Sequence, residues 1–218
     1  MRRLIAPSWH PAAVLLAAQL IGVVVFPFLE QSVGQSALQL AGLLILVIAV
    51  RGVQVSPAIT GISIGLGVPI VVLVILQVID STNGTWDFLG FVLLAAFYVY
   101  TSYALVRYLL LEEQVNADTL LAAGATFTVV AWAFAYAFAA VQVVWPGSFT
   151  PTPTGDGRTW FELLFLSFSN LTSVGLSDIV PILSTARSVV MLEQFAGVMY
   201  VALVVSRVVG MTVVRARP

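Results

Sequence analysis

Six long apolar runs, each close to the length that crosses a bilayer, constrain the fold of this chain most strongly. A membrane-spanning helix needs about 20 consecutive, mainly apolar residues. The runs near this length are residues 11–29, 37–53, 57–79, 88–111, 119–144 and 186–211. Only 9% of the residues are charged, too few to cover a soluble domain of this size. The sequence therefore predicts an all-α integral membrane protein with six transmembrane helices.

The basic residues, all arginines, are distributed unevenly along these runs. If the N-terminus is cytoplasmic, only Arg158 and Arg187 fall outside the cell. The arginines that then fall on the cytoplasmic side are Arg2, Arg3, Arg51, Arg107, Arg207, Arg215 and Arg217. Cytoplasmic segments of membrane proteins carry the excess of basic residues. The pattern indicates a multi-pass protein of the plasma (cytoplasmic) membrane with both termini in the cytoplasm.

The stretch from Trp160 to Gly197 differs from a simple span. Residues 145–157 are rich in proline, glycine and threonine, which predicts a surface loop without regular structure. The apolar helix expected next, residues 159–170, is too short to cross the bilayer. A polar, glycine-bearing segment, residues 171–178, separates it from the last span. Irregular backbone at membrane depth needs protein or a water-filled cavity around it, so this order is typical of a re-entrant pore loop.

Residues 172–178, Thr-Ser-Val-Gly-Leu-Ser-Asp, resemble the filter signature of potassium channels, Thr-Thr-Val-Gly-Tyr-Gly-Asp. The likeness continues in register on the C-terminal side. Pro181 matches the proline after the filter, Arg187 an arginine at the start of the inner helix, and Gly197 the inner-helix glycine treated as a gating hinge. The run 192–200 is similar to the inner helix of small bacterial potassium-channel proteins. The preceding spans match that family only in number and topology.

This resemblance implies the pore-forming subunit of a homotetrameric, potassium-channel-like cation channel in a bacterial plasma membrane. It divides the chain into a four-helix domain, 1–117, with sensor-like topology, and a pore domain, 118–218, with outer helix 119–144, pore helix 159–170, filter 173–177 and inner helix 186–211. The implied partners are other copies of the chain, membrane lipid and monovalent cations, but not nucleic acid. No cofactor besides the permeant K⁺, and no enzymatic activity, is expected.

The chemistry of such a filter comes from the backbone. A dehydrated cation needs surrounding oxygen atoms, which consecutive carbonyls facing one axis can supply. The predicted conducting segment begins at Thr172, and its K⁺ ligands are the carbonyls of Ser173, Val174, Gly175, Leu176 and Ser177, with the Ser173 hydroxyl as a possible inner ligand. Successive carbonyls point the same way only if the backbone alternates in handedness, which glycine does at little cost. One chain forms one wall, so four chains are required.

Two positions depart from the family pattern. Leu176 replaces the tyrosine whose hydroxyl braces the filter from behind, and Ser177 replaces the second glycine. A non-glycine residue in a left-handed conformation costs about 1–2 kcal/mol. We therefore expect relaxed discrimination between K⁺ and Na⁺, or the loss of outer ion sites.

Charged residues near the filter allow more than one role. Asp178 could line the outer mouth or bond to the pore helix, and Phe165 and Leu166 replace a tryptophan pair that would favour the bond. Ionisable residues within membrane segments are functional candidates by default. For Glu162 and Glu193, however, we expect structural roles, either a bond to loop backbone or an ion pair with Arg158 or Arg187.

Gating and conduction stay open at this level. Steep voltage gating needs several arginines on one helix, and run 88–111 has only Arg107, so canonical voltage gating is not expected. Gly197 could be a hinge or could permit close helix packing. The alternative function is a non-conducting or regulatory membrane protein that retains the channel fold.

Overall fold

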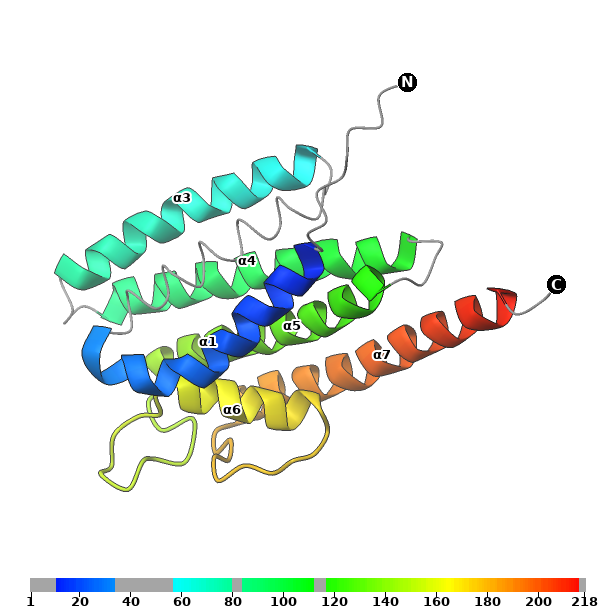
Figure 1. Cartoon of the computed structure of the whole chain (residues 1–218). Coiled ribbons are helices and arrows are strands. Elements are labelled where there is room, and N and C mark those ends of the chain that lie inside the picture. The colour runs from blue at the N-terminus through cyan, green and yellow to red at the C-terminus, as the bar shows by residue number, and fades with distance from the viewer. Residues whose placement is uncertain (1–10, 34–56, 80–83, 112–116, 216–218) are drawn as a thin grey trace.

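The computed structural model describes residues 11–33, 57–79, 84–111 and 117–215, which form helices and no strand (Figure 1). The helices are α1 (Pro11–Val33), α3 (Pro57–Ile79), α4 (Gly84–Leu111), α5 (Ala117–Val144), α6 (Trp160–Leu171) and α7 (Ser184–Arg215). The predicted all-α fold is confirmed. The run predicted at residues 37–53 lies outside the described residues.

Three of the described helices are long and apolar enough to cross a membrane. They are α4, α5 and the first part of α7, Ser184–Val204. Shorter apolar stretches, residues 12–28 and 65–77, lie in α1 and α3. The membrane class of the protein is therefore confirmed, whereas the number of six spans stays a prediction.

Helix α5 is the central element of the bundle. It packs against α1, α4, α6 and α7, while α3 packs on α4. Small side chains let helix backbones approach closely in membranes. The buried alanines of α5 that do so are Ala122, Ala125, Ala131, Ala133, Ala135, Ala139 and Ala140. A buried hydrogen bond of 2.5 Å from Thr128 Oγ1 to Gln19 Oε1 also joins α5 to α1.

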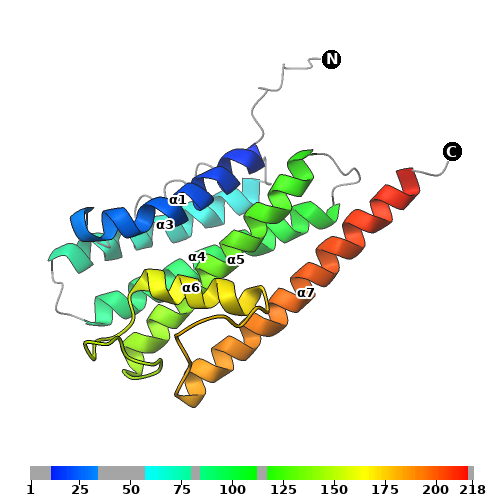
Figure 2. The same ribbon diagram turned by 60° about the horizontal axis from the view of Figure 1, so that its bottom comes forward.

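The short helix α6 lies across α5, between α1 and α7 (Figure 2). Its start is set by a capping box, in which Thr159 Oγ1 accepts from Glu162 N and the Glu162 carboxylate accepts from Thr159 N at 2.8 Å. On the α1 side, the ring of Phe26 stacks on that of Phe161, with ring centroids 5.2 Å apart, and its centroid lies 5.1 Å from that of Trp160. Twelve residues of α-helix span about 18 Å, too little to cross the membrane.

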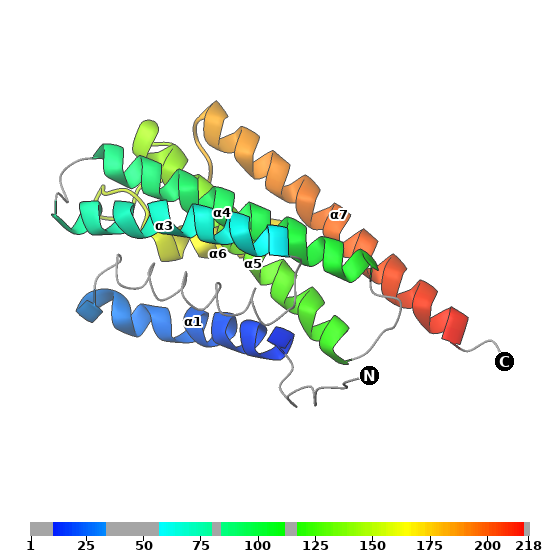
Figure 3. The same cartoon turned by 90° about the horizontal axis from the view of Figure 1, so that it is seen from above.

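Helix α7 lies on the opposite side of α5 from α1 and extends beyond the other helices (Figure 3). Among the described helices, its main packing partners are α5 and α6. Its buried residues Ala186, Val190, Glu193 and Gly197 recur at helical spacing and so form one stripe. The exposed apolar side chains are Met191, Leu192, Phe195, Val198, Met199, Val201 and Leu203. Each of these side chains is at least 42% exposed, so the described residues leave much of this apolar surface uncovered.

The segment between α5 and α6 is more ordered than the sequence suggests. Residues 145–157 have no helix or strand, as predicted, but Ser148 and Phe149 are buried rather than at the surface. Phe149 forms an isolated antiparallel bridge with Pro181, and Ile182 N donates to Ser148 O at 2.8 Å. Ser148 and Phe149 are buried because they pair with residues 181–182, which follow the predicted filter in the sequence. Local composition does not reveal such a long-range contact.

Candidate ion-conducting site

The chain leaves α6 through a tight turn at Thr172. The Thr172 hydroxyl donates to Phe168 O at 2.7 Å, so it is tied back to the helix. Ser173 N donates to Asn170 O at 2.9 Å, and Gly175 N donates to Ser169 O at 3.0 Å. These bonds anchor the inner part of the predicted filter to the last turn of α6.

The backbone alternates in handedness at this point. Ser173 has φ 60° and Gly175 has φ 68°, with Val174 between them outside the left-handed region. Among the described residues, Ser173 is the only non-glycine residue with positive φ, so Ser177 does not adopt the left-handed conformation of the glycine that it replaces. Instead, the Ser177 hydroxyl accepts a bond from Ile179 N at 3.0 Å. The cost of a left-handed residue, about 1–2 kcal/mol, falls on Ser173.

The carbonyl oxygens of residues 173–177 are available to a ligand. Within the described part of the chain, none of the five accepts a hydrogen bond. The flanking side chains are also uncovered, since Val174 is 68% and Leu176 75% exposed. The same part of the chain contains no cluster of three or more metal-ligating side chains. The chemistry that this segment offers is a row of consecutive backbone oxygens.

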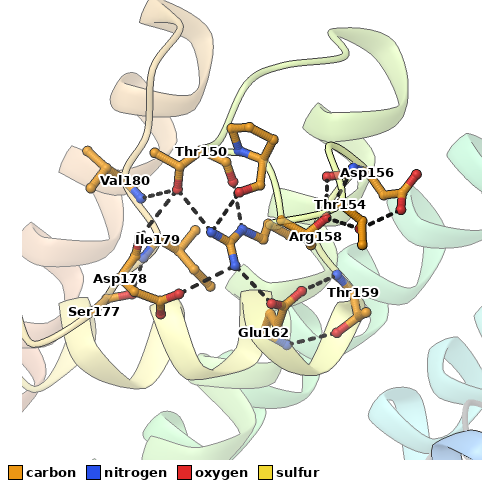
Figure 4. Close-up of polar contacts among 12 residues, drawn as sticks. Thr150, Thr154, Asp156, Arg158, Thr159, Glu162, Ser177, Asp178, Ile179 and Val180 are labelled. Atoms are coloured by element: carbon orange, nitrogen blue, oxygen red, sulfur yellow. Dashed lines mark hydrogen bonds and ion pairs between the residues drawn. The ribbon is translucent and has the colours of Figure 1, made fainter.

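Asp178 is exposed and contacts Arg158 rather than the pore helix, so its role at the outer mouth stays a prediction. Its side chain is 72% exposed, as a mouth-lining carboxylate requires, and its Oδ2 lies 3.4 Å from Arg158 Nη1. The contact is made to the residue before the cap of α6 rather than to the helix itself. Figure 4 shows this pair beside Glu162.

The two glutamates have different partners. Glu162 makes both expected contacts, a bond to the backbone of Thr159 and an ion pair with Arg158 at 2.9 Å. Glu193 makes neither of the expected contacts. It is fully buried, and its Oε1 accepts from the hydroxyl of Ser167 on α6. The prediction failed because the pairing depends on how α7 crosses α6, and not on sequence distance.

Gly197 lies against the end of α6. A Cβ built on this residue would clash with the carbonyl oxygen of Leu171 and lie 3.0 Å from its carbonyl carbon. The glycine therefore permits close packing of α7 on α6, the second of the two roles considered. A role as a gating hinge stays a prediction.

Arg158 was expected only as a partner for Glu162 or Glu193, and not as a site residue. Its only local signal was the spacing to Glu162, since residues four apart face each other on a helix. Its contacts with Thr150, Pro151 and Asp178 arise from segments that come together only in the fold.

Comparison with known families agrees with this geometry. Residues 124–214 match a family model described as "Ion channel". No curated protein and no solved structure matches the chain. The matched segment contains α6, residues 173–178, most of α5 and nearly all of α7, as the filter resemblance predicts. The match covers less than half of the chain, and it supports the resemblance of this part to a potassium-channel-like pore family.

Proposed function

We propose that the protein is the pore-forming subunit of a homotetrameric cation channel that passes K⁺ passively down its gradient. The observation that carries this proposal is the row of carbonyl oxygens at 173–177 without hydrogen bonds, held between a short helix and a spanning helix. Carbonyl oxygens of this kind replace the hydration shell of a permeant cation. The C-terminal end of α6 adds a negative dipole at the start of this row.

The exposed surface supports assembly from several copies. Irregular backbone at membrane depth must be covered by protein or line a water-filled cavity, and lipid provides neither. In one chain the segment 173–177 is exposed on one side, as is the apolar face of α7. Four copies around one axis would cover both surfaces and surround the ion with carbonyl oxygens.

Selectivity between K⁺ and Na⁺ should be relaxed. Leu176 has no polar group with which to brace the segment, and Ser177 is not in the left-handed conformation. The outer half of the carbonyl row is therefore less constrained than the inner half, where Gly175 N and Ser173 N are bonded to α6. Voltage gating of the canonical kind is not part of the proposal, because α4 contains a single arginine, Arg107.

Flux through purified protein in liposomes tests this function. We expect a K⁺ current with a measurable Na⁺ permeability under bi-ionic conditions, and loss of that current in Gly175→Val. This substitution places a branched side chain at φ 68°, so it should distort the carbonyl row. A tetramer that assembles but passes neither ion would instead support a non-conducting, regulatory role, and a strictly K⁺-selective current would contradict relaxed selectivity.

A further inference from the structure

Arg158 has a buried guanidinium at the N-terminal end of α6, with its side chain only 6% exposed. A guanidinium has five N–H donors in a rigid plane. The structure provides five acceptors: Thr150 O at 2.6 Å from Nε, Pro151 O at 3.1 Å and Thr150 Oγ1 at 3.4 Å from Nη2, and Glu162 Oε1 at 2.9 Å and Asp178 Oδ2 at 3.4 Å from Nη1. Every donor therefore has a partner, and two of the partners are carboxylates.

The backbone of Arg158 is fixed independently of its side chain. Gln142 on α5 accepts a bond from Arg158 N at 2.9 Å and donates to Arg158 O at 2.8 Å. The central helix of the bundle thus holds this residue by both of its peptide groups. Because the backbone of Arg158 is fixed in this way, its side chain can hold other segments in place.

Arg158 also contacts the segment 178–180, which directly follows the carbonyl row at 173–177. Thr150 N donates to Val180 O at 3.0 Å, and Val180 N donates to Thr150 Oγ1 at 3.2 Å. The Thr150 hydroxyl also donates to Asp178 O at 3.3 Å. Residues 178–180 are therefore attached to Arg158 twice, directly through the Asp178 carboxylate and indirectly through Thr150, as Figure 4 shows.

The outer half of the carbonyl row has few other supports. The hydrogen bond from Gly175 N to Ser169 O is the last backbone bond between the carbonyl row and α6. The next side chain, Leu176, is apolar and exposed. Between Gly175 and Asp178, the described chain offers one further bond, the local one from Ile179 N to the Ser177 hydroxyl. The conformation of Leu176 and Ser177 must therefore depend strongly on where Asp178 is held.

We propose that Arg158 is the positioning residue of the outer filter: its guanidinium fixes Asp178 and the segment after it against α5 and α6, and thereby sets the spacing of the outer carbonyl oxygens. This inference deepens the proposed function and rests on it, because it assigns the network a part in ion selection. This role also explains why a guanidinium is buried at the start of α6 and why each of its five N–H donors has an acceptor.

Two measurements on the full-length protein in nanodiscs or liposomes test the proposal. Hydrogen–deuterium exchange reports how firmly residues 178–182 are held, whether or not the protein conducts. Bi-ionic reversal potentials report the K⁺/Na⁺ permeability ratio. The variants are Arg158→Gln and Asp178→Asn, and the control is Arg107→Gln, which removes the same charge from an exposed arginine on α4.

In Arg158→Gln we expect the amides of residues 178–180 and 182 to exchange about tenfold faster than in the wild type, because local opening no longer breaks the guanidinium contacts. The permeability ratio should fall by about threefold as the carbonyl spacing loosens. Asp178→Asn weakens one of the five contacts, at an exposed site, so it should change the exchange rate and the permeability ratio in the same direction but by less. Arg107→Gln should leave both near wild type.

Two results would overturn the proposal: equal exchange in Arg158→Gln and Arg107→Gln, or faster exchange with an unchanged permeability ratio. If Arg158→Gln does not assemble, Arg158→Lys and Asp178→Asn decide the matter, since lysine keeps the charge but loses the planar set of donors. A wild-type protein that passes no ions would refute the proposed function, and exchange would still show whether Arg158 holds residues 178–182.

Discussion

At the scale of single residues, Glu193 provides a contact between α6 and α7 that a mutation can isolate. Its carboxyl group is fully buried and bonded to the hydroxyl of Ser167, which also lies 2.8 Å from Ala131 O on α5. Glu193→Ala should lower the free energy of unfolding by about 1–3 kcal/mol, because a buried hydroxyl loses a partner. Thermal unfolding in detergent measures the change.

The matched variants for this position are Glu193→Gln and Gln194→Ala. Glutamine retains an acceptor and a donor at the same distance from the backbone, so we expect it to preserve most of the stability. Gln194 is the exposed neighbour, and its truncation should have little effect. Equal unfolding temperatures for Glu193→Ala and Gln194→Ala would show that the contact with Ser167 contributes nothing.

The two departures from the filter signature make a second prediction at residue scale. The double variant Leu176→Tyr, Ser177→Gly introduces a hydroxyl that can brace the segment and a residue that adopts φ > 0 without strain. We expect the K⁺/Na⁺ permeability ratio to rise by about tenfold, a difference of ~1.4 kcal/mol between the two ions. Bi-ionic reversal potentials measure the ratio. Leu176→Phe, Ser177→Gly is the control without the hydroxyl, and an equal gain there would rule out bracing through it.

At the scale of helices, the crossing of α6 and α7 depends on Gly197. Gly197→Ala would push a methyl group into the Leu171 carbonyl, and overpacking of this kind costs about 1–3 kcal/mol. Gly210→Ala on the same helix is the control, since a Cβ there meets nothing within 4 Å. We expect the unfolding temperature to fall only in Gly197→Ala. If both variants behave alike, close packing is not the reason for the glycine, and a hinge becomes the better explanation.

The helices were more predictable than their contacts. The apolar runs predicted the ends of α3 and α6 to within one residue. The length of α3 follows from the thickness of the bilayer, and the start of α6 follows from the capping box at Thr159, so both depend on neighbouring residues alone. The contact of Arg158 with Asp178 and that of Glu193 with Ser167 were not predictable in the same way. Each joins residues twenty or more positions apart in the sequence, so only the packing of the folded chain brings them together.

At the scale of the whole molecule, the pore unit is joined to the helices before it through α5 and α6. Phe26 of α1 stacks on Phe161, while Tyr98 of α4 contacts Trp132 of α5 with ring centroids 5.8 Å apart. Trp132 in turn contacts Trp160 at 5.1 Å. Aromatic contacts therefore join both α1 and α4 to the N-terminal end of α6, next to Arg158.

The orientation in the membrane is the last property that belongs to the whole molecule. The uneven distribution of arginines predicts that the loop between α5 and α6 is extracellular and that the C-terminal ends of α4 and α7 are cytoplasmic. The chain has no cysteine, so a single introduced thiol can report its side of the membrane. Thr154→Cys and Leu111→Cys are suitable because both positions are exposed and lie in or beside the two sets of loops.

An impermeant maleimide added to intact cells should label Thr154→Cys at once and label Leu111→Cys only after permeabilisation. The opposite pattern would invert the topology and place Asp178 and Arg158 on the cytoplasmic side. The parent protein without cysteine gives the background, and a variant with cysteine at Ala133, buried in α5, controls for access through lipid. With the predicted pattern, the Arg158 network lies at the outer mouth, where cations would enter from outside the cell.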